Sequence, residues 1–324
     1  MIILMSPNPA QQARLTASEM APLWFAAPIL NATDTVRFSR SVKDCVAAGV
    51  SPKSREAVLV FNIGLLEAVL GLLPTPKLDI CSLYQWVPLD RLPLKKRLCY
   101  NRVLGKSRVI LTYSRLAETD LSARFPDTPV KWIGLFTDTA FFNPAGLPSP
   151  SDEFILCPGD HKRIESVVTK IATALKVKVV RFATDPKVAA YYEQNPCPYV
   201  TCVTNVPFVE VRRLYQAAKL VINVADDRFW PVGITTFCEA LAMNKPVVTP
   251  GGHSSSGYCF ADGYRPYWTV KNAFDADEWV SVVGKALQAG LAWPENKLPR
   301  ELALKLCSFD TQTTVWKNVL TSLS

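Results

Sequence analysis

The stretch Gly233-Ile-Thr-Thr-Phe-Cys-Glu-Ala-Leu-Ala-Met-Asn-Lys-Pro-Val-Val248 decides the fold of this chain. Small residues run into helix-forming residues, and the final Pro-Val-Val is typical of the start of a buried strand. Residues 230–233, Trp-Pro-Val-Gly, cannot continue a helix, so the helix begins just after the glycine and its free N–H groups favour an anion. The stretch therefore predicts a βα corner in an α/β protein, where open sheets bind ligands.

Glu239 lies inside the predicted helix, one to two turns past its start. A carboxylate at this place can accept two hydrogen bonds from a diol such as a ribose, but it would repel a phosphate. The helix N-terminus and Glu239 together suit the two parts of a sugar nucleotide. Doubly wound proteins without a ligand at this place also contain such a corner, in which Pro246 only ends one element and begins the next. The corner alone leaves both interpretations open.

Length and composition limit the protein class. The chain has 324 residues, which suits two domains of about 150 residues each. Its hydrophobic content of 49% and charged content of 20% are typical of a soluble globular protein. The formal net charge of +8 favours an anionic partner, which the charge alone does not identify as a nucleic acid, an acidic membrane or a phosphorylated substrate.

The cysteines and histidines point to no special chemistry. The nine cysteines are scattered singly, and the N-terminus resembles no secretory signal, so we expect reduced thiols in a cytoplasmic protein. The two histidines, His161 and His253, are too few and too far apart to indicate a metal site. We expect neither a metal nor a cofactor.

Positive charge is densest in residues 91–108, which include Lys95, Lys96 and Arg97. Leucines and other apolar residues alternate with the basic ones, as in an amphipathic helix. A solvated helix face explains this pattern, and so does a peripheral contact with an anionic membrane. No nucleic-acid motif or series of stacking aromatic residues accompanies the run, so we do not expect a nucleic acid as a partner.

Apolar runs alternate with helical stretches along the whole chain, which is the pattern of an α/β protein. After a first strand at the N-terminus, the first half is predicted to contain strands at residues 58–61, 78–83, 109–113 and 130–133 and helices at residues 10–21, 36–48, 65–73, 94–104 and 116–124. The second half is predicted to contain strands at residues 154–157, 177–182, 200–203, 220–224 and 246–249 and helices at residues 163–175, 188–194, 208–217 and 302–323.

A turn-rich segment at residues 143–151 separates the two halves. We therefore expect an N-terminal Rossmann-like domain at residues 1–146 and a C-terminal one at residues 151–300. A last helical segment, residues 301–324, follows the second domain, and the sequence leaves open whether it returns to the first.

Four segments together resemble the retaining glycosyltransferases of family 4. They are Ser-Arg-Val-Ile-Leu-Thr-Tyr-Ser and the following helix at residues 107–121, Trp-Ile-Gly-Leu-Phe-Thr-Asp at residues 132–138 with its continuation to residue 144, Leu-Cys-Pro-Gly-Asp-His-Lys-Arg at residues 156–163, and residues 206–222 with 233–248. Their order and spacing are more specific than any single motif. The resemblance implies the GT-B fold, in which two Rossmann-like domains face each other across a cleft that holds a nucleotide-sugar donor.

The resemblance also implies an activity and a set of substrate-binding residues. Glu239 matches the glutamate that holds the nucleotide ribose. The loop beside the donor phosphates and sugar corresponds to Gly233, Ile234, Thr235 and Thr236, and the basic residues for the diphosphate are Lys162 and Arg163. The implied reaction moves a hexose from a nucleoside diphosphate sugar to an unidentified acceptor with retention of configuration. Cationic side chains and a helix N-terminus would stabilise the leaving diphosphate without a metal.

The chain departs from the family pattern at three places. The first glutamate of the family, eight positions before Glu239, falls at Pro231, and Asp226 or Asp227 are the nearest substitutes. No histidine occurs near residues 84–86, where many relatives carry one, and the first ~55 residues lack a clear glycine-rich loop. Two alternatives therefore stay open: a nucleotide-sugar epimerase of GT-B fold, and a catalytically degenerate protein that binds a nucleotide sugar.

Overall fold

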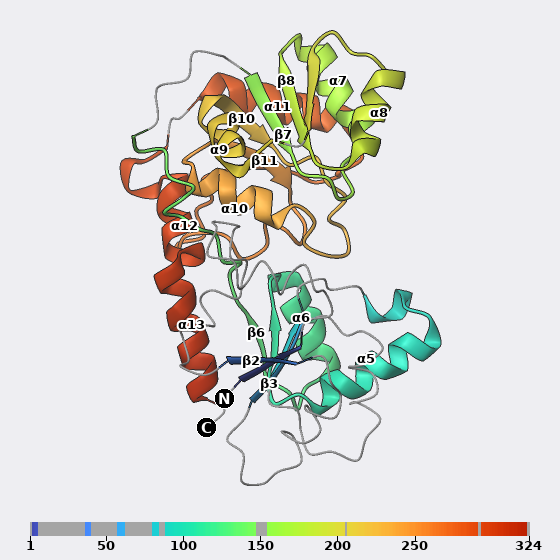
Figure 1. Ribbon diagram of the computed structural model, residues 1–324, viewed down its shortest axis with the longest axis vertical. Helices are drawn as coiled ribbons and strands as arrows, with labels where there is room; N and C mark the ends of the chain where they lie inside the picture. Colours follow the sequence, from blue (N-terminus) through green and yellow to red (C-terminus); the bar gives the residue numbers. More distant parts are fainter. Residues whose placement is uncertain are drawn as a thin grey trace. The chain divides into compact units, whose positions relative to one another are not determined.

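The structure is a computed structural model of the 324-residue chain. It describes the backbone of residues 2–5, 36–39, 57–61 and 80–83, and both backbone and side chains of residues 88–146, 154–204, 206–290 and 293–322. The chain divides into two compact units, Met1–Phe136 with Phe309–Ser324, and Thr137–Ser308. Figure 1 shows the elements of both units in sequence colours. The described part of the turn-rich segment, residues 143–146, belongs to the second unit.

The first unit contains a six-stranded parallel sheet in the order β2-β1-β3-β4-β5-β6. Its strands are β1 Ile2–Met5, β2 Val36–Ser39, β3 Ala57–Phe61, β4 Ile80–Leu83, β5 Ile110–Thr112 and β6 Val130–Trp132. Its described helices are the 3₁₀ helix η1 Leu89–Arg91 and the α-helices α5 Leu94–Lys106, α6 Arg115–Arg124 and α13 Phe309–Thr321.

Local chemistry explains where these elements begin. All three residues of β5 are buried, as expected for a parallel strand that is covered on both faces. The strand ends at Ser114, whose side chain accepts a 3.3 Å hydrogen bond from the N–H of Ala117 and caps α6. The same residue thus ends the strand and starts the helix.

The second unit contains a six-stranded parallel sheet in the order β12-β11-β10-β7-β8-β9. Its strands are β7 Phe154–Pro158, β8 Val179–Ala183, β9 Val200–Thr204, β10 Ala218–Ile222, β11 Val247–Pro250 and β12 Trp268–Val270. Its helices are α7 Glu165–Leu175, α8 Pro186–Gln194, α9 Phe208–Ala217, α10 Ile234–Ala242, α11 Ala276–Ala289, η2 Glu295–Lys297 and α12 Pro299–Cys307.

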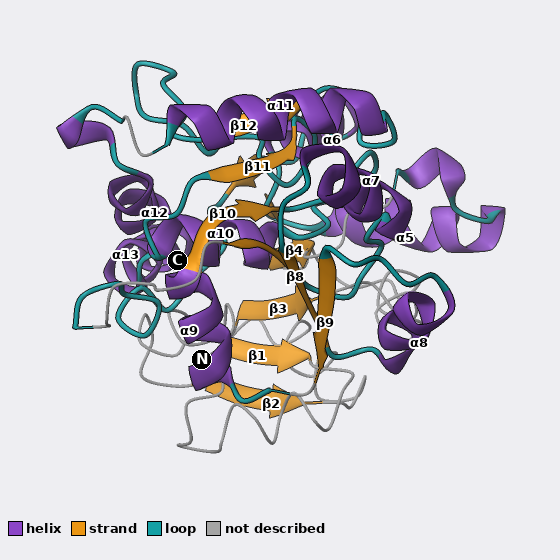
Figure 2. Cartoon of the chain, turned by 90° about the horizontal axis from the view of Figure 1, so that it is seen from above, coloured by secondary structure: helices purple, strands orange, loops and turns teal. Residues whose placement is uncertain are grey.

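Helices α7 and α11 pack against each other over one face of this second sheet (Figure 2). Alternate strand residues, among them Ile155, Cys157 and Leu220, meet Val168 and Trp279 of the two helices in one buried cluster. The alternation follows from the period of two in a strand, which sends neighbouring side chains to opposite faces. The other face carries the residues of α10, of which eight are buried.

The structure confirms the predicted α/β class, and the predicted strands agree with the observed ones to within two residues at each end. Residues 36–39 are an exception, because they form strand β2 and not the start of a helix. Their alternating Val-Arg-Phe-Ser pattern suits a strand, and parallel pairing with β1 decides the conformation. The prediction did not include β12 and α11. The helices expected at residues 10–21 and 65–73 lie outside the described residues.

The predicted helix at residues 302–323 is two helices. Ser308 has an extended conformation, with φ −62° and ψ 158°, and separates α12 from α13. The two helices belong to different compact units, so the break falls at the division of the chain. In the part of the chain that the structure describes, no helix has the length and apolar character that crossing a membrane requires.

Candidate functional site

Helix α10 begins directly after Gly233, as predicted. Gly233 has a left-handed conformation with φ 78°, and a Cβ atom there would lie 2.1 Å from Oδ1 of Asn223. Only glycine fits this combination of backbone angle and close packing. No side chain of the described residues caps the helix, so its first N–H groups keep their capacity to bind an anion.

Arg163 lies in the loop between β7 and α7 and reaches the start of α10. Its Nη2 donates a 3.1 Å hydrogen bond to Oγ1 of Thr236, while Nε donates to the carbonyl of Pro158 at 3.0 Å and Nη1 to that of His161 at 3.1 Å. Gly159 leaves room for the guanidinium, because a Cβ there would lie 2.4 Å from Nη2. Burial lowers the pKa of Arg163 from its usual value, yet an arginine stays cationic at neutral pH. A fixed positive charge therefore stands at the helix N-terminus.

The other basic residue of this loop, Lys162, takes a different direction. Its Nζ lies 3.8 Å from the centroid of the Trp230 ring, in the range of a cation–π interaction, and its backbone has a positive φ of 49°. Lys162 is exposed, whereas Ile234 is buried in the core and Thr235 is half-buried. Of the two predicted basic residues, the structure brings Arg163 to the side chain of Thr236 and Lys162 to Trp230.

Glu239 is buried in α10 and bonded to Tyr215 of α9. The Tyr215 hydroxyl donates a 2.8 Å hydrogen bond to Oε2 of Glu239 and lies 3.4 Å from the carbonyl oxygen of Thr236. Burial raises the pKa of Glu239 to about 7, and the hydrogen bond from Tyr215 acts in the opposite direction. Burial and the neighbouring carboxylate together raise the pKa of Tyr215 well above its usual value. Tyr215 thus remains a neutral donor, while Glu239 changes charge near neutral pH.

Tyr215 is the contact that sequence reasoning missed. It lies in the segment of residues 206–222 that resembles the family, but nothing in that segment assigns its hydroxyl to a partner. With it, Arg163, Thr236 and Glu239 form one connected group across three elements of the second unit. The group lies where β7 and β10 end, because these neighbouring parallel strands end at the same edge of the sheet.

Asp226 and Asp227, the candidate substitutes for a carboxylate at position 231, both have protein partners. Asp226 accepts 2.8 Å and 3.1 Å hydrogen bonds from Arg228. Asp227 is 2% exposed, and its Oδ2 accepts hydrogen bonds from the N–H and the hydroxyl of Ser254. The ion pair with Arg228 lowers the pKa of Asp226, while burial raises that of Asp227 to about 6. Both carboxylates therefore hold loops together in this structure.

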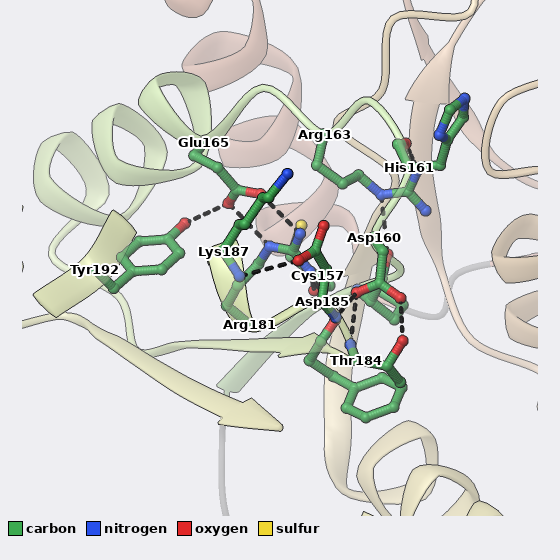
Figure 3. A network of polar contacts seen from close by, with 12 residues as sticks. Cys157, Asp160, His161, Arg163, Glu165, Arg181, Thr184, Asp185, Lys187 and Tyr192 are labelled. Atoms are coloured by element: carbon green, nitrogen blue, oxygen red, sulfur yellow. Dashed lines mark hydrogen bonds and ion pairs between the residues drawn. The ribbon is translucent and has the colours of Figure 1, made fainter. Parts of the chain in front are cut away.

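A second polar network supports the loop that carries Arg163 (Figure 3). Arg181 of β8 is fully buried and forms two hydrogen bonds of 2.9 Å and 2.7 Å to Glu165, which also accepts one from Tyr192 at 2.7 Å. Nη1 of Arg181 donates to the carbonyl of Cys157 in β7. The ion pair thus ties the start of α7 to the ends of β7 and β8.

In the same loop, Asp160 accepts hydrogen bonds from the N–H and hydroxyl groups of Thr184 and from the N–H of Asp185 (Figure 3). These bonds lower the pKa of Asp160, although burial acts against them. Sequence reasoning assigned no role to Asp160 or Arg181. A charged residue in the middle of the Val-Val-Arg-Phe-Ala strand, however, is a sequence signal of a buried ion pair.

Comparison with known proteins identifies the fold. No family model and no curated protein matches the sequence. Among solved structures, HepE from Anabaena in complex with UDP has a TM-score of 0.67 at 12% identity, with 99% of each chain covered. A sucrose-phosphate synthase from Thermosynechococcus elongatus has a TM-score of 0.66 at 16% identity, with 87% of this chain and 77% of that chain covered.

A glycosyltransferase from Rickettsia africae is also similar, with a TM-score of 0.56 at 11% identity and 98% of each chain covered. At such identities the similarity concerns the fold alone. These glycosyltransferases have the architecture that the family resemblance predicted, and the two parallel sheets with their helices match it. The chain therefore has the GT-B fold.

Proposed function

We propose that the protein is a glycosyltransferase that moves a hexose from a nucleoside diphosphate sugar to an acceptor with retention of configuration. One observation carries the proposal: Arg163 and the N-terminus of α10 meet at Thr236, and the carboxylate of Glu239 follows in the same helix. A cationic end and a buried carboxylate suit the diphosphate and the ribose diol of one nucleotide. The similarity to HepE, which was solved with UDP and with UDP-glucose, supports this choice of donor.

Charge stabilisation would supply most of the acceleration. When the bond between sugar and diphosphate breaks, negative charge grows on the diphosphate oxygens, and a fixed guanidinium with free helix N–H groups stabilises it. Asp160 and Arg181 hold the Arg163 loop in place, so the cation does not have to reorganise during the reaction. Removal of one such preorganised donor typically lowers the rate about 10² to 10³-fold.

A second candidate function is binding of a nucleotide sugar without transfer. Position 231 is a proline, and the two nearby aspartates are engaged with Arg228 and Ser254. No carboxylate on this loop is thus free of a protein partner in the described structure to hold the donor sugar. This candidate predicts donor affinity in the micromolar range with no release of nucleoside diphosphate.

The proposal is tested with purified protein and a panel of UDP-, GDP-, ADP- and dTDP-sugars. Calorimetry measures binding, and a coupled assay measures release of the nucleoside diphosphate with water or an added acceptor. NMR of the freshly released sugar distinguishes retention from inversion, and an epimerised donor in the absence of acceptor would identify an epimerase. If none of the donors binds or is cleaved, the proposal is wrong.

Two variants connect the activity to the site. Arg163→Gln is expected to slow release of the nucleoside diphosphate by about two orders of magnitude. Arg213→Gln is the matched control, because Arg213 is exposed and pairs only with Glu210 one turn earlier in α9. Equal rates for Arg163→Gln and the control would remove Arg163 from the proposed site.

A further inference from the structure

Helix α5 of the first unit exposes an apolar ridge. Leu94 is 60% exposed and Leu98 is 54% exposed, and residues four apart lie one above the other on a helix. Arg102 continues the same ridge one turn later and is exposed. Val103 and Leu104 are fully buried and attach the other side of the helix to the unit. Figure 1 shows η1 and α5 at the periphery of this unit.

The surface around the ridge is strongly basic. Helix α5, Leu-Lys-Lys-Arg-Leu-Cys-Tyr-Asn-Arg-Val-Leu-Gly-Lys, contains five basic residues and no acidic one. Lys95, Lys96 and Arg102 are exposed and form no ion pair with the described residues. The acidic residue just before the helix, Asp90, is bonded to Arg124 at 2.7 Å and 2.8 Å. The positive charge of α5 is therefore not neutralised by the described part of its own unit.

We propose that this face of α5, defined by Leu94, Lys95, Leu98 and Arg102, binds the surface of an anionic lipid bilayer. A helix that lies in the interface buries leucines below the headgroups while its basic side chains reach the phosphates. Neither feature alone would require a membrane: a solvated helix would not need the two leucines, and a nucleic acid would not bury them. Charge complementarity and the apolar ridge occur on the same side of one helix. The proposal is independent of the proposed reaction.

Flotation with lipid vesicles tests the proposal on the full chain. Vesicles of phosphatidylcholine with 30% phosphatidylserine are compared with vesicles of phosphatidylcholine alone at about 0.15 M salt. We expect binding to the anionic vesicles, weaker binding at higher salt, and little binding to the neutral ones. Each basic residue near such a surface raises the affinity about fivefold, so the triple variant Lys95→Gln/Lys96→Gln/Arg102→Gln is expected to bind on the order of a hundredfold more weakly.

The matched control separates this helix from net charge. Lys178→Gln/Lys285→Gln/Lys317→Gln removes the same three charges from exposed positions outside α5 and is expected to bind like the unchanged protein. Leu94→Ser/Leu98→Ser is expected to weaken vesicle binding, whereas Leu304→Ser, which is 41% exposed in α12, is not. Circular dichroism verifies that each variant folds.

Several outcomes would overturn the proposal. They are a control triple as weak as the α5 triple, equal binding to neutral vesicles, and no vesicle binding by the unchanged protein. Tight binding to an oligonucleotide without vesicle binding would assign the basic face to nucleic acid instead. None of these outcomes depends on glycosyltransferase activity, so failure here and failure of the proposed function are distinguishable.

Discussion

The hydroxyl of Tyr215 in α9 donates a 2.8 Å hydrogen bond to Oε2 of Glu239 in α10, and both side chains are buried. Twenty-four residues separate the two in the sequence. Because the bond lowers the pKa of a carboxyl group that burial raises, Tyr215 helps to decide whether Glu239 is ionised near pH 7. A structural contact of this kind links the packing of two helices to the charge of the candidate ribose ligand.

Tyr215→Phe is expected to lower both the stability of the protein and its affinity for nucleotide. Loss of the donor costs about 1–2 kcal/mol of unfolding free energy and raises the pKa of Glu239 further, so less of it is ionised at pH 7. Urea denaturation and calorimetry with UDP-glucose measure the two effects. Tyr192→Phe, which removes a hydroxyl bonded to Glu165, is the control: it should lower stability and leave nucleotide affinity unchanged.

Affinity for UDP-glucose is expected to rise about tenfold between pH 6 and pH 8, if the carboxylate form of Glu239 holds the ribose and its pKa is about 7. The donor itself does not titrate in this range, so the change reports on the protein. Calorimetry at several pH values measures it, and Glu239→Gln should give a flat profile in this window. A slope that persists in Glu239→Gln would assign the pH dependence to another group.

The same group affects stability with the opposite trend. A folded-state pKa of about 7, above the usual value of 4.5, means that the folded protein holds this proton more tightly than the unfolded chain. The contribution is fully present below pH 4.5 and is lost as the pH rises through 7. Glu239→Gln is therefore expected to be more stable than the unchanged protein at pH 8, by up to about 3 kcal/mol, in urea denaturation.

Gly233→Ala is expected to destabilise the protein by more than Gly263→Ala does. The two glycines have nearly the same φ, 78° and 82°, so alanine suffers about 1–2 kcal/mol of backbone strain at either position. At Gly233 the new Cβ also collides with Oδ1 of Asn223, whereas at Gly263 no atom lies within 4 Å. Urea denaturation of the two variants isolates the collision. Equal losses would mean that the Asn223 side chain moves aside without cost.

Arg181→Met is expected to lower the unfolding free energy by about 3–5 kcal/mol, because it leaves Glu165 unpaired inside the second unit. Arg213→Met removes an exposed pair with Glu210 and should change stability by less than about 1 kcal/mol. The double variant Arg181→Met/Glu165→Gln should recover part of the loss, since no unpaired charge remains. A double variant no more stable than Arg181→Met would show that the lost hydrogen bonds to backbone carbonyls dominate.

Local patterns predicted much of the fold. The start of α10 after Gly233 was predictable because a glycine with positive φ and the preceding proline interrupt regular structure within a few residues. Strand β2 was not, because its conformation depends on pairing with β1, 34 positions earlier in register. The break at Ser308 was also missed, since its residue type does not interrupt a helical pattern and the two helices belong to different units.

The sequence by itself determined the α/β class, the two parallel sheets as an expectation, and the place of Glu239 in the helix after a glycine turn, because these depend on residue periodicity and on glycine and proline. Only the tertiary structure decided that Arg163 meets Thr236, 73 residues away, while Lys162 turns to Trp230. The physical reason is strand order: β7 pairs with β10, so the loops after these two strands meet at one edge of the sheet. No local pattern encodes which strands are neighbours.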